Sequence, residues 1–224
     1  MKSEIMLAAL FLLELLCLWW ASTKQHRWLH GLVIINMVCI SIFGEKLVSS
    51  FGFVSNVGNI CYAFVCVAQI NLCIIEKDQK NAILNILRAL ASLLMLLAFS
   101  QVIISLPVVS GNEEFSNAAV RVASAAPNIV VASFLAFVVS QTVLIKIFTV
   151  SSGSTFLKFV FATVVCQVLD SAIFFPIAFI GNMHSSIIGL AVVGCITKVV
   201  VMLLLFPLSY KISKLRTGKG TPYS

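Results

Sequence analysis

The chain is dominated by apolar runs of roughly 20 residues, the length that crosses the hydrocarbon core of a bilayer at 1.5 Å per residue. Of its 224 residues, 60% are hydrophobic and only 10% are charged, which is too little charge to cover a soluble domain of this size. Backbone polar groups in lipid find no water to bind, so runs of this kind must be helices. The sequence therefore predicts an all-α fold, a polytopic membrane helix bundle.

The apolar pattern predicts seven spans, separated by segments with Gly, Pro and Ser: 5–20, 29–43, 53–75, 82–106, 127–149, 157–180 and 186–209. The first run contains Glu14 and ends without a small-residue cleavage site, so we interpret it as a span and not as a signal peptide. The chain then divides into an extra N-terminal helix with a basic loop (1–28), a six-helix core (29–210) and a basic tail (211–224).

The connecting segments alternate in charge along the chain, whose net charge is +7. Every second connection is rich in Lys and Arg, as is the tail, whereas the other connections are uncharged or carry acidic residues beside their cations. Because basic loops stay in the cytoplasm, we expect a multi-pass protein of the cell (inner) membrane with its N-terminus outside and its C-terminus in the cytoplasm. The cations adjoin apolar runs, so we expect a lipid bilayer and no nucleic acid as partner.

The cysteines and the motif content argue against catalysis. All seven cysteines lie within apolar runs and form no CxxC pair, so they are interpreted as small packing residues. The sequence has no metalloprotease, nucleophile-elbow, phosphate-loop or dinucleotide motif. We therefore expect no enzyme, no metal and no cofactor.

Four ionisable residues lie inside the apolar runs, where a charge costs several kcal/mol and indicates a functional site by default. Arg88 is about two turns from a helix end and can snorkel, which favours a structural role. Glu14 faces either a partner helix or the outer interface. Asp170 and Lys198 lie ~16–20 Å from the outer ends of consecutive antiparallel helices, so an ion pair is expected. That pair is either a structural clamp or part of a polar cavity.

Amide side chains occur in the same apolar runs: Asn36, Gln69, Asn71, Gln101, Gln141 and Gln167. Gln167, Asp170 and Phe174 are spaced three and four residues apart, so they share one helix face. A carboxylate, an amide and an aromatic ring together could read a flat heterocycle, by accepting its N–H groups and stacking on it. Each of these residues alone is more often a contact between helices.

Two segments resemble the signature of the queuosine precursor transporter family, which is vitamin-uptake-transporter-like. They are PNIVVASFLAFVVSQ at 127–141 and QVLDSAIF at 167–174, followed by IAF and Gly181. Lys198 falls where that family has a lysine in its last helix, and weaker similarity extends over residues 30–210. The resemblance implies a six-helix core related to the substrate-binding subunits of energy-coupling-factor importers. It also implies transport of 7-deazaguanine bases for tRNA modification salvage.

The chain departs from that family at several polar positions. It has Asn128 where the family has arginine after the proline, and Leu144 where the family has aspartate. The acidic pair at the end of the third helix is represented by Asn71, Glu76 or both. These departures leave open a base with a different side chain or charge, such as queuine or a related purine.

Together, the polar stripe and the resemblance predict import of a queuosine precursor or queuine, a small planar polar substrate. The expected substrate-binding residues are Asp170, Gln167, Gln141, Phe174, Lys198, Asn71 and Asn128. Two alternatives stay open: a substrate-binding subunit of an energy-coupling-factor importer for another vitamin-like molecule, and a non-transporting membrane scaffold. A homo-oligomer and a separate energy-coupling ATPase module are compatible with the sequence, and neither is required.

Overall fold

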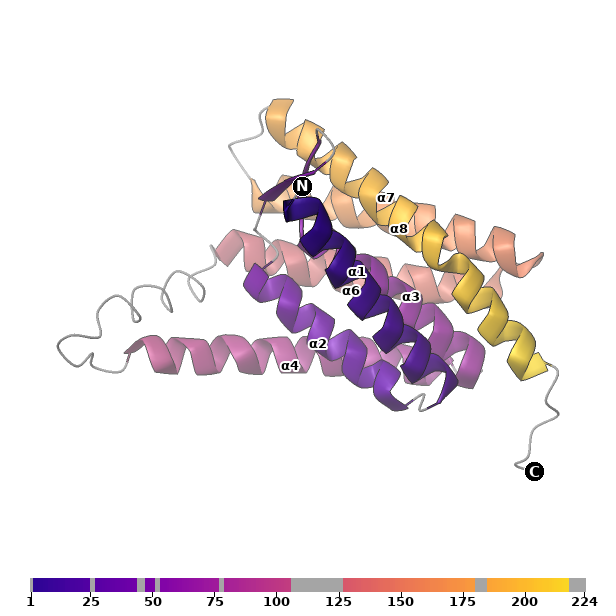
Figure 1. Ribbon diagram of the computed structural model, residues 1–224. Coiled ribbons are helices and arrows are strands. Elements are labelled where there is room, and N and C mark those ends of the chain that lie inside the picture. The colour runs from indigo at the N-terminus through magenta and orange to yellow at the C-terminus, as the bar shows by residue number, and fades with distance from the viewer. Residues whose placement is uncertain are drawn as a thin grey trace.

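The computed structural model describes residues 2–24, 27–43, 47–50, 53–76, 79–105, 127–179 and 185–217. Its helices are α1 (Lys2–Thr23), α2 (Arg27–Phe43), α3 (Gly58–Glu76), α4 (Gln79–Ser105), α6 (Pro127–Val150), α7 (Thr155–Ala178) and α8 (Ser185–Thr217) (Figure 1). The predicted helix bundle is confirmed. One detail is wrong: residues 53–56, predicted as the start of a span, form strand β2 (Phe53–Asn56), which pairs antiparallel with β1 (Leu47–Ser50).

Six of these helices are long and apolar enough to cross a membrane, namely α1, α3, α4, α6, α7 and α8. The remaining one, α2, is also apolar but has 17 residues. At 1.5 Å per residue it is about 26 Å long, slightly less than the hydrocarbon core. The structure thus contains a helix for each of the seven predicted spans, and a complete crossing by α2 stays a prediction.

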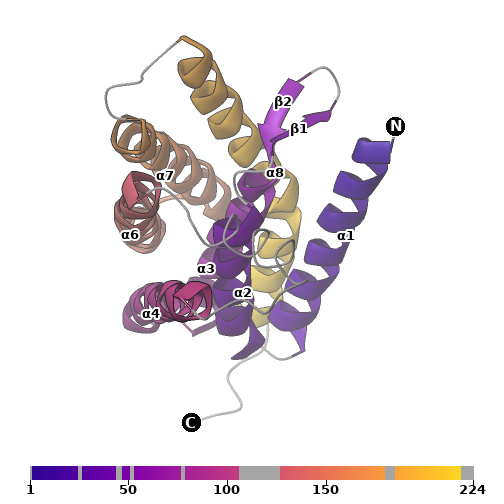
Figure 2. The same cartoon turned by 90° about the vertical axis from the view of Figure 1, so that its left-hand side faces the viewer.

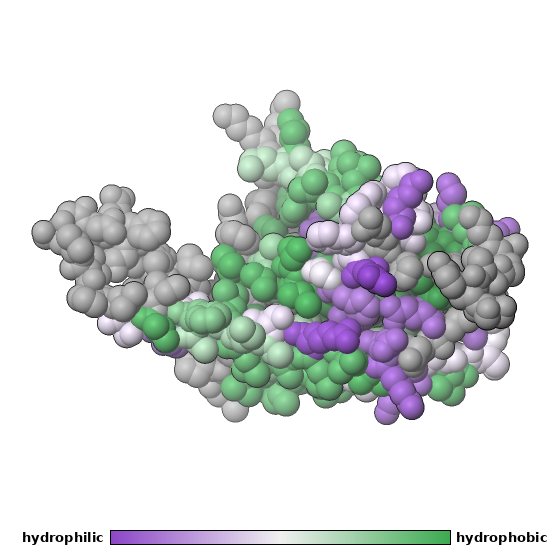
Figure 3. Space-filling view, turned by 90° about the horizontal axis from the view of Figure 1, so that it is seen from below, coloured by the Kyte–Doolittle hydropathy of each residue, from purple (hydrophilic) through white to green (hydrophobic). Residues whose placement is uncertain are grey.

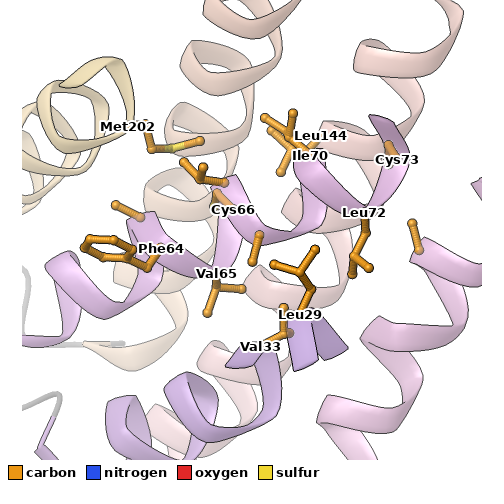
Figure 4. Close-up of a cluster of buried hydrophobic side chains, with 14 of the residues drawn as sticks. Leu29, Val33, Phe64, Val65, Cys66, Ile70, Leu72, Cys73, Leu144 and Met202 are labelled. Carbon is orange, nitrogen blue, oxygen red and sulfur yellow. The ribbon is translucent and has the colours of Figure 1, made fainter. Parts of the chain in front are cut away.

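Helix α3 lies at the centre of the bundle, in contact with α1, α2, α4, α6 and α8 (Figure 2). Every residue from 61 to 73 is buried, as expected for a helix that is apolar on all sides. Figure 4 shows how its side chains fill the interior: Leu72 lies near Leu29 of α2, and Ile70 lies near Leu144 of α6. The central helix therefore connects the N-terminal helices to α6 and α8.

The outer helices expose Leu, Ile, Val and Phe side chains along their length, and apolar residues cover much of the face in Figure 3. Hydrophilic side chains gather at one end of that face, the end where Figure 1 places the end of α1, the start of α2 and the end of α8. Exposed cations at these helix ends include Lys24, Arg27 and Lys214. The basic ends thus gather on one side, and the assignment of that side to the cytoplasm stays a prediction.

Helix α8 approaches α3 closely at Gly194, which is buried. A Cβ atom at this position would lie 3.2 Å from Nδ2 of Asn59. One turn further along both helices, Lys198 of α8 meets the ring of Tyr62 of α3. The glycine therefore sets the separation of α3 and α8 next to the embedded lysine.

We expect Gly194→Leu to destabilise the protein by about 1–3 kcal/mol, because the added side chain forces α3 and α8 apart. Gly194→Ala should be tolerated, since the end of the Asn59 side chain can move by a few tenths of an ångström. Gly189→Leu on the same helix is the matched control, because a Cβ there meets nothing within 4 Å. Thermal unfolding of the three purified variants in detergent measures the effect, and equal losses in both Leu variants would contradict it.

Candidate functional site

The ion pair predicted between Asp170 of α7 and Lys198 of α8 is confirmed. The Lys198 Nζ atom lies 2.5 Å from Asp170 Oδ2, and the two residues are 6% (Asp170) and 7% (Lys198) exposed. The ammonium also lies over the ring of Tyr62, 4.6 Å from its centroid. A single buried charge among apolar helices would be costly. The ion pair therefore stabilises both charged groups, and the Tyr62 ring stabilises the ammonium further.

Tyr62 connects this ion pair to α6. Its hydroxyl lies 2.6 Å from the Ser140 Oγ atom, and Ser140 itself donates to the Phe137 carbonyl at 3.3 Å. Because the Ser140 hydroxyl proton is used in the bond to Phe137, the Tyr62 hydroxyl donates to the Ser140 Oγ atom. We use the name ion-pair layer for the four residues that meet here: Tyr62, Ser140, Asp170 and Lys198.

A second polar set lies one helical turn away. The Gln141 amide nitrogen is 3.0 Å from Cys66 Sγ. The Gln167 amide nitrogen lies 3.4 Å from the same sulfur and 3.4 Å from Met202 Sδ. We use the name amide layer for Cys66, Gln141, Gln167 and Met202.

The two layers stack because each helix contributes to both. Cys66 follows Tyr62 by four residues on α3, and Met202 follows Lys198 by four on α8. Gln167 precedes Asp170 by three on α7, which runs in the opposite direction. Residues three and four apart lie on one helix face, so α3, α7 and α8 each contribute to both layers from one face. Helix α6 contributes the consecutive residues Ser140 and Gln141.

The amide layer holds two strong acceptors without donors. The Oε1 atoms of Gln141 and Gln167 are buried and have no hydrogen-bond partner among the described residues, and both side chains are fully buried. Their amide nitrogens contact only sulfur, which is a weak acceptor. An unsatisfied buried polar group costs about 1–3 kcal/mol. A bound molecule that offers N–H groups would remove this cost.

The structure brings together four of the seven residues predicted to bind substrate: Asp170, Lys198, Gln141 and Gln167. Phe174 is half-buried, and its ring makes edge-on contacts with Phe175 and Phe179 at centroid distances of 5.2 and 6.5 Å. It therefore packs among aromatic residues towards the end of α7. A binding role for any of these residues stays a prediction.

The other two predicted residues lie elsewhere or outside the described side chains. Asn71 donates from Nδ2 to Ser22 Oγ of α1 at 3.2 Å, which connects α1 to the central helix. The side chain of Asn128 lies outside the described residues. The arginine at position 88, predicted to be structural, is exposed on α4, and Glu14 faces a partner helix, where Asn36 donates to it.

Sequence reasoning did not assign Tyr62, Cys66, Ser140 or Met202 to the site. These residue types are ordinary in apolar runs, so composition gives no signal for them. A usable signal was the hydroxyl of Tyr62 within a span, since a buried tyrosine needs a polar partner. Its partner could not be identified before the rotation of α3 was known.

A family model described as "Putative vitamin uptake transporter" matches residues 56–212. The match contains all eight residues of the two layers, and it begins after α1 and α2. No curated protein matches the chain, and no solved structure does. Because the matched segment covers more than half of its length, the chain belongs to the vitamin uptake transporter family.

Proposed function

We propose that the protein imports a 7-deazaguanine base, a queuosine precursor or queuine, across the cell membrane. Membership of an uptake family supports transport of a vitamin-like molecule. The observation that carries the choice of substrate is the amide layer, where two buried oxygens without donors lie one turn from a carboxylate and an ammonium. A scaffold would be expected to pair these groups completely.

The chemistry of such a base complements the two layers. A guanine-like ring presents neighbouring N–H donors and a carbonyl acceptor on one edge. The Asp170 carboxylate can accept two parallel N–H groups, and the oxygens of Gln141 and Gln167 can accept others. Lys198 can donate to the carbonyl, and the Tyr62 ring offers a face for stacking. The four-helix cluster therefore suits a planar molecule that is rich in N–H donors.

In this proposal Lys198 serves the empty site as well as the loaded one. Without substrate, its ammonium compensates the Asp170 charge. When a base arrives, its N–H groups share that carboxylate, and the long lysine stem lets the ammonium shift towards the carbonyl of the base. The two charges thus remain compensated throughout the cycle, which a membrane interior requires.

The test is tRNA modification in cells that cannot make queuosine precursors, with and without this protein. We expect modification to be restored by added 7-deazaguanine bases and not to be blocked by excess adenine. The same bases should enter liposomes that contain the purified protein alone. Uptake only in the presence of an ATPase module would favour the energy-coupling-factor alternative, and failure with every base in both assays would contradict the proposal.

A further inference from the structure

We propose that Glu14 binds the proton that drives import, so that α1 and α2 form the coupling site of a proton-coupled transporter. This inference rests on the import proposed above. It concerns a part of the chain that precedes the family match at residues 56–212.

Glu14 lies near the middle of α1 (Lys2–Thr23), on the face that packs against the bundle. Leu18 and Ala21 on that face are buried, and Phe11 packs against the core. Spacings of three, four and three residues place these four side chains on one stripe. Glu14, which is half-buried, therefore points towards the protein at membrane depth.

The only described hydrogen-bond donor to the Glu14 carboxylate is an amide. Asn36 Nδ2 donates to Glu14 Oε2 at 3.1 Å and to the Leu32 carbonyl at 3.1 Å. Among the described residues no cation lies within ion-pair distance of Glu14, and the titratable groups that interact with it electrostatically include the thiols of Cys39 on α2 and Cys61 on α3. Unlike Asp170, this carboxylate has no countercharge, so its ionised form is costly at this depth.

Asn36 supplies an independent observation. The residue is 1% exposed, and its Oδ1 atom is buried without a hydrogen-bond partner in the part of the chain that the structure describes. Protonation turns a carboxylate into an O–H donor. A protonated Glu14 can then donate to Asn36 Oδ1 while it still accepts from Asn36 Nδ2. One proton removes the uncompensated charge and completes the hydrogen bonds of the pair.

The central helix connects this pair to the ion-pair layer. Both α1 and α2 pack against α3. Cys61 of α3 is close enough to Glu14 for an electrostatic interaction, and it directly precedes Tyr62, which lies beneath the Lys198 ammonium. A change in the packing of α1 and α2 on protonation therefore acts on α3, the helix that carries Tyr62 and Cys66 of the base site. This gives a physical route by which proton binding can bias substrate binding.

The test uses purified protein in liposomes and two assays with a labelled 7-deazaguanine base. Counterflow exchange at equal pH measures transport itself, and accumulation under an inward proton gradient measures coupling. For one proton per base, each pH unit can support about tenfold accumulation. We expect wild type to do both, and Glu14→Gln to keep exchange within about twofold while losing gradient-driven accumulation, since Gln mimics the protonated acid.

Arg88→Gln is the matched control, because it also removes a charge from a membrane helix but at an exposed position on α4. It should retain both activities. Absence of exchange in wild type would contradict the import proposal, whereas accumulation by Glu14→Gln would overturn the coupling proposal alone. If Glu14→Gln does not fold, wild type decides: base uptake must acidify the liposome lumen, and uptake without acidification overturns the inference.

Discussion

Replacing Asp170 with Asn is expected to lower import by at least about 100-fold, the effect of losing two charge-assisted hydrogen bonds to the base. Asn has nearly the same shape, but it cannot accept two N–H groups as a carboxylate does. The substitution also leaves the Lys198 ammonium buried without its anion. Breaking a buried pair from one side costs about 3–5 kcal/mol, so this variant should lose both import and stability.

The double variant Asp170→Asn/Lys198→Met separates these two effects. It removes both charges and keeps similar side-chain volumes, so its stability should return to within about 1–2 kcal/mol of wild type. Import should stay lost, because the base has no carboxylate to bind. Thermal unfolding in detergent measures the first quantity, and uptake normalised to protein in the membrane measures the second.

The two roles left open for the ion pair predict opposite outcomes for this double variant. A clamp that touches no substrate would be replaced by the neutral pair, and import would recover together with stability. Recovery of stability without import indicates that the carboxylate binds substrate. Lys198→Met alone should be less stable than wild type. That result would show that the double variant regains stability because no unpaired charge is left, and not because of the methionine itself.

The Asp170–Lys198 pair could be predicted because it depends only on the signs of the two charges, their depth in the membrane and the order of the helices. Two opposite charges at equal depth on consecutive antiparallel helices have no other low-energy partner. The position of Tyr62 could not be predicted in the same way. Helix α3 is buried on every side, and its amides Gln69 and Asn71 lie on different faces, so its sequence shows no single polar face from which its rotation could be inferred.

The hairpin and the outlying amides show a second limit of sequence reasoning. Residues 53–56 are apolar enough to extend a span, but they pair with β1 instead, because short apolar runs do not distinguish strand from helix. Asn71 was grouped with the substrate-binding residues by family similarity, whereas its amide nitrogen donates to Ser22 of α1. Which helix an embedded amide faces depends on packing, which the sequence alone does not contain.

Replacing Gln167 with Leu should lower the affinity for the base by about 10–100-fold while leaving the protein as stable as wild type or more so by about 1 kcal/mol. Within the described residues, the amide nitrogen hydrogen-bonds only to sulfur atoms, and the amide oxygen has no partner. Leu fills similar space without a polar group to satisfy. Equilibrium binding of a labelled base and thermal unfolding are measured on the same purified sample.

Gln69→Leu is the matched control, because this buried amide accepts from Asn85 of α4 at 3.4 Å and belongs to neither layer. Its loss removes the Gln69 oxygen that accepts from the Asn85 amide, so stability should fall while the affinity of the folded protein is unchanged. The two glutamines should therefore show opposite patterns. If Gln167→Leu instead loses stability and keeps its affinity, the amide layer is a contact between helices, and the unpaired oxygens do not await a ligand. Loss of affinity with retained stability in Gln167→Leu would mean that the protein tolerates the free-energy cost of unpaired amide oxygens at the place where its substrate binds. This is expected of a binding site and not of a scaffold.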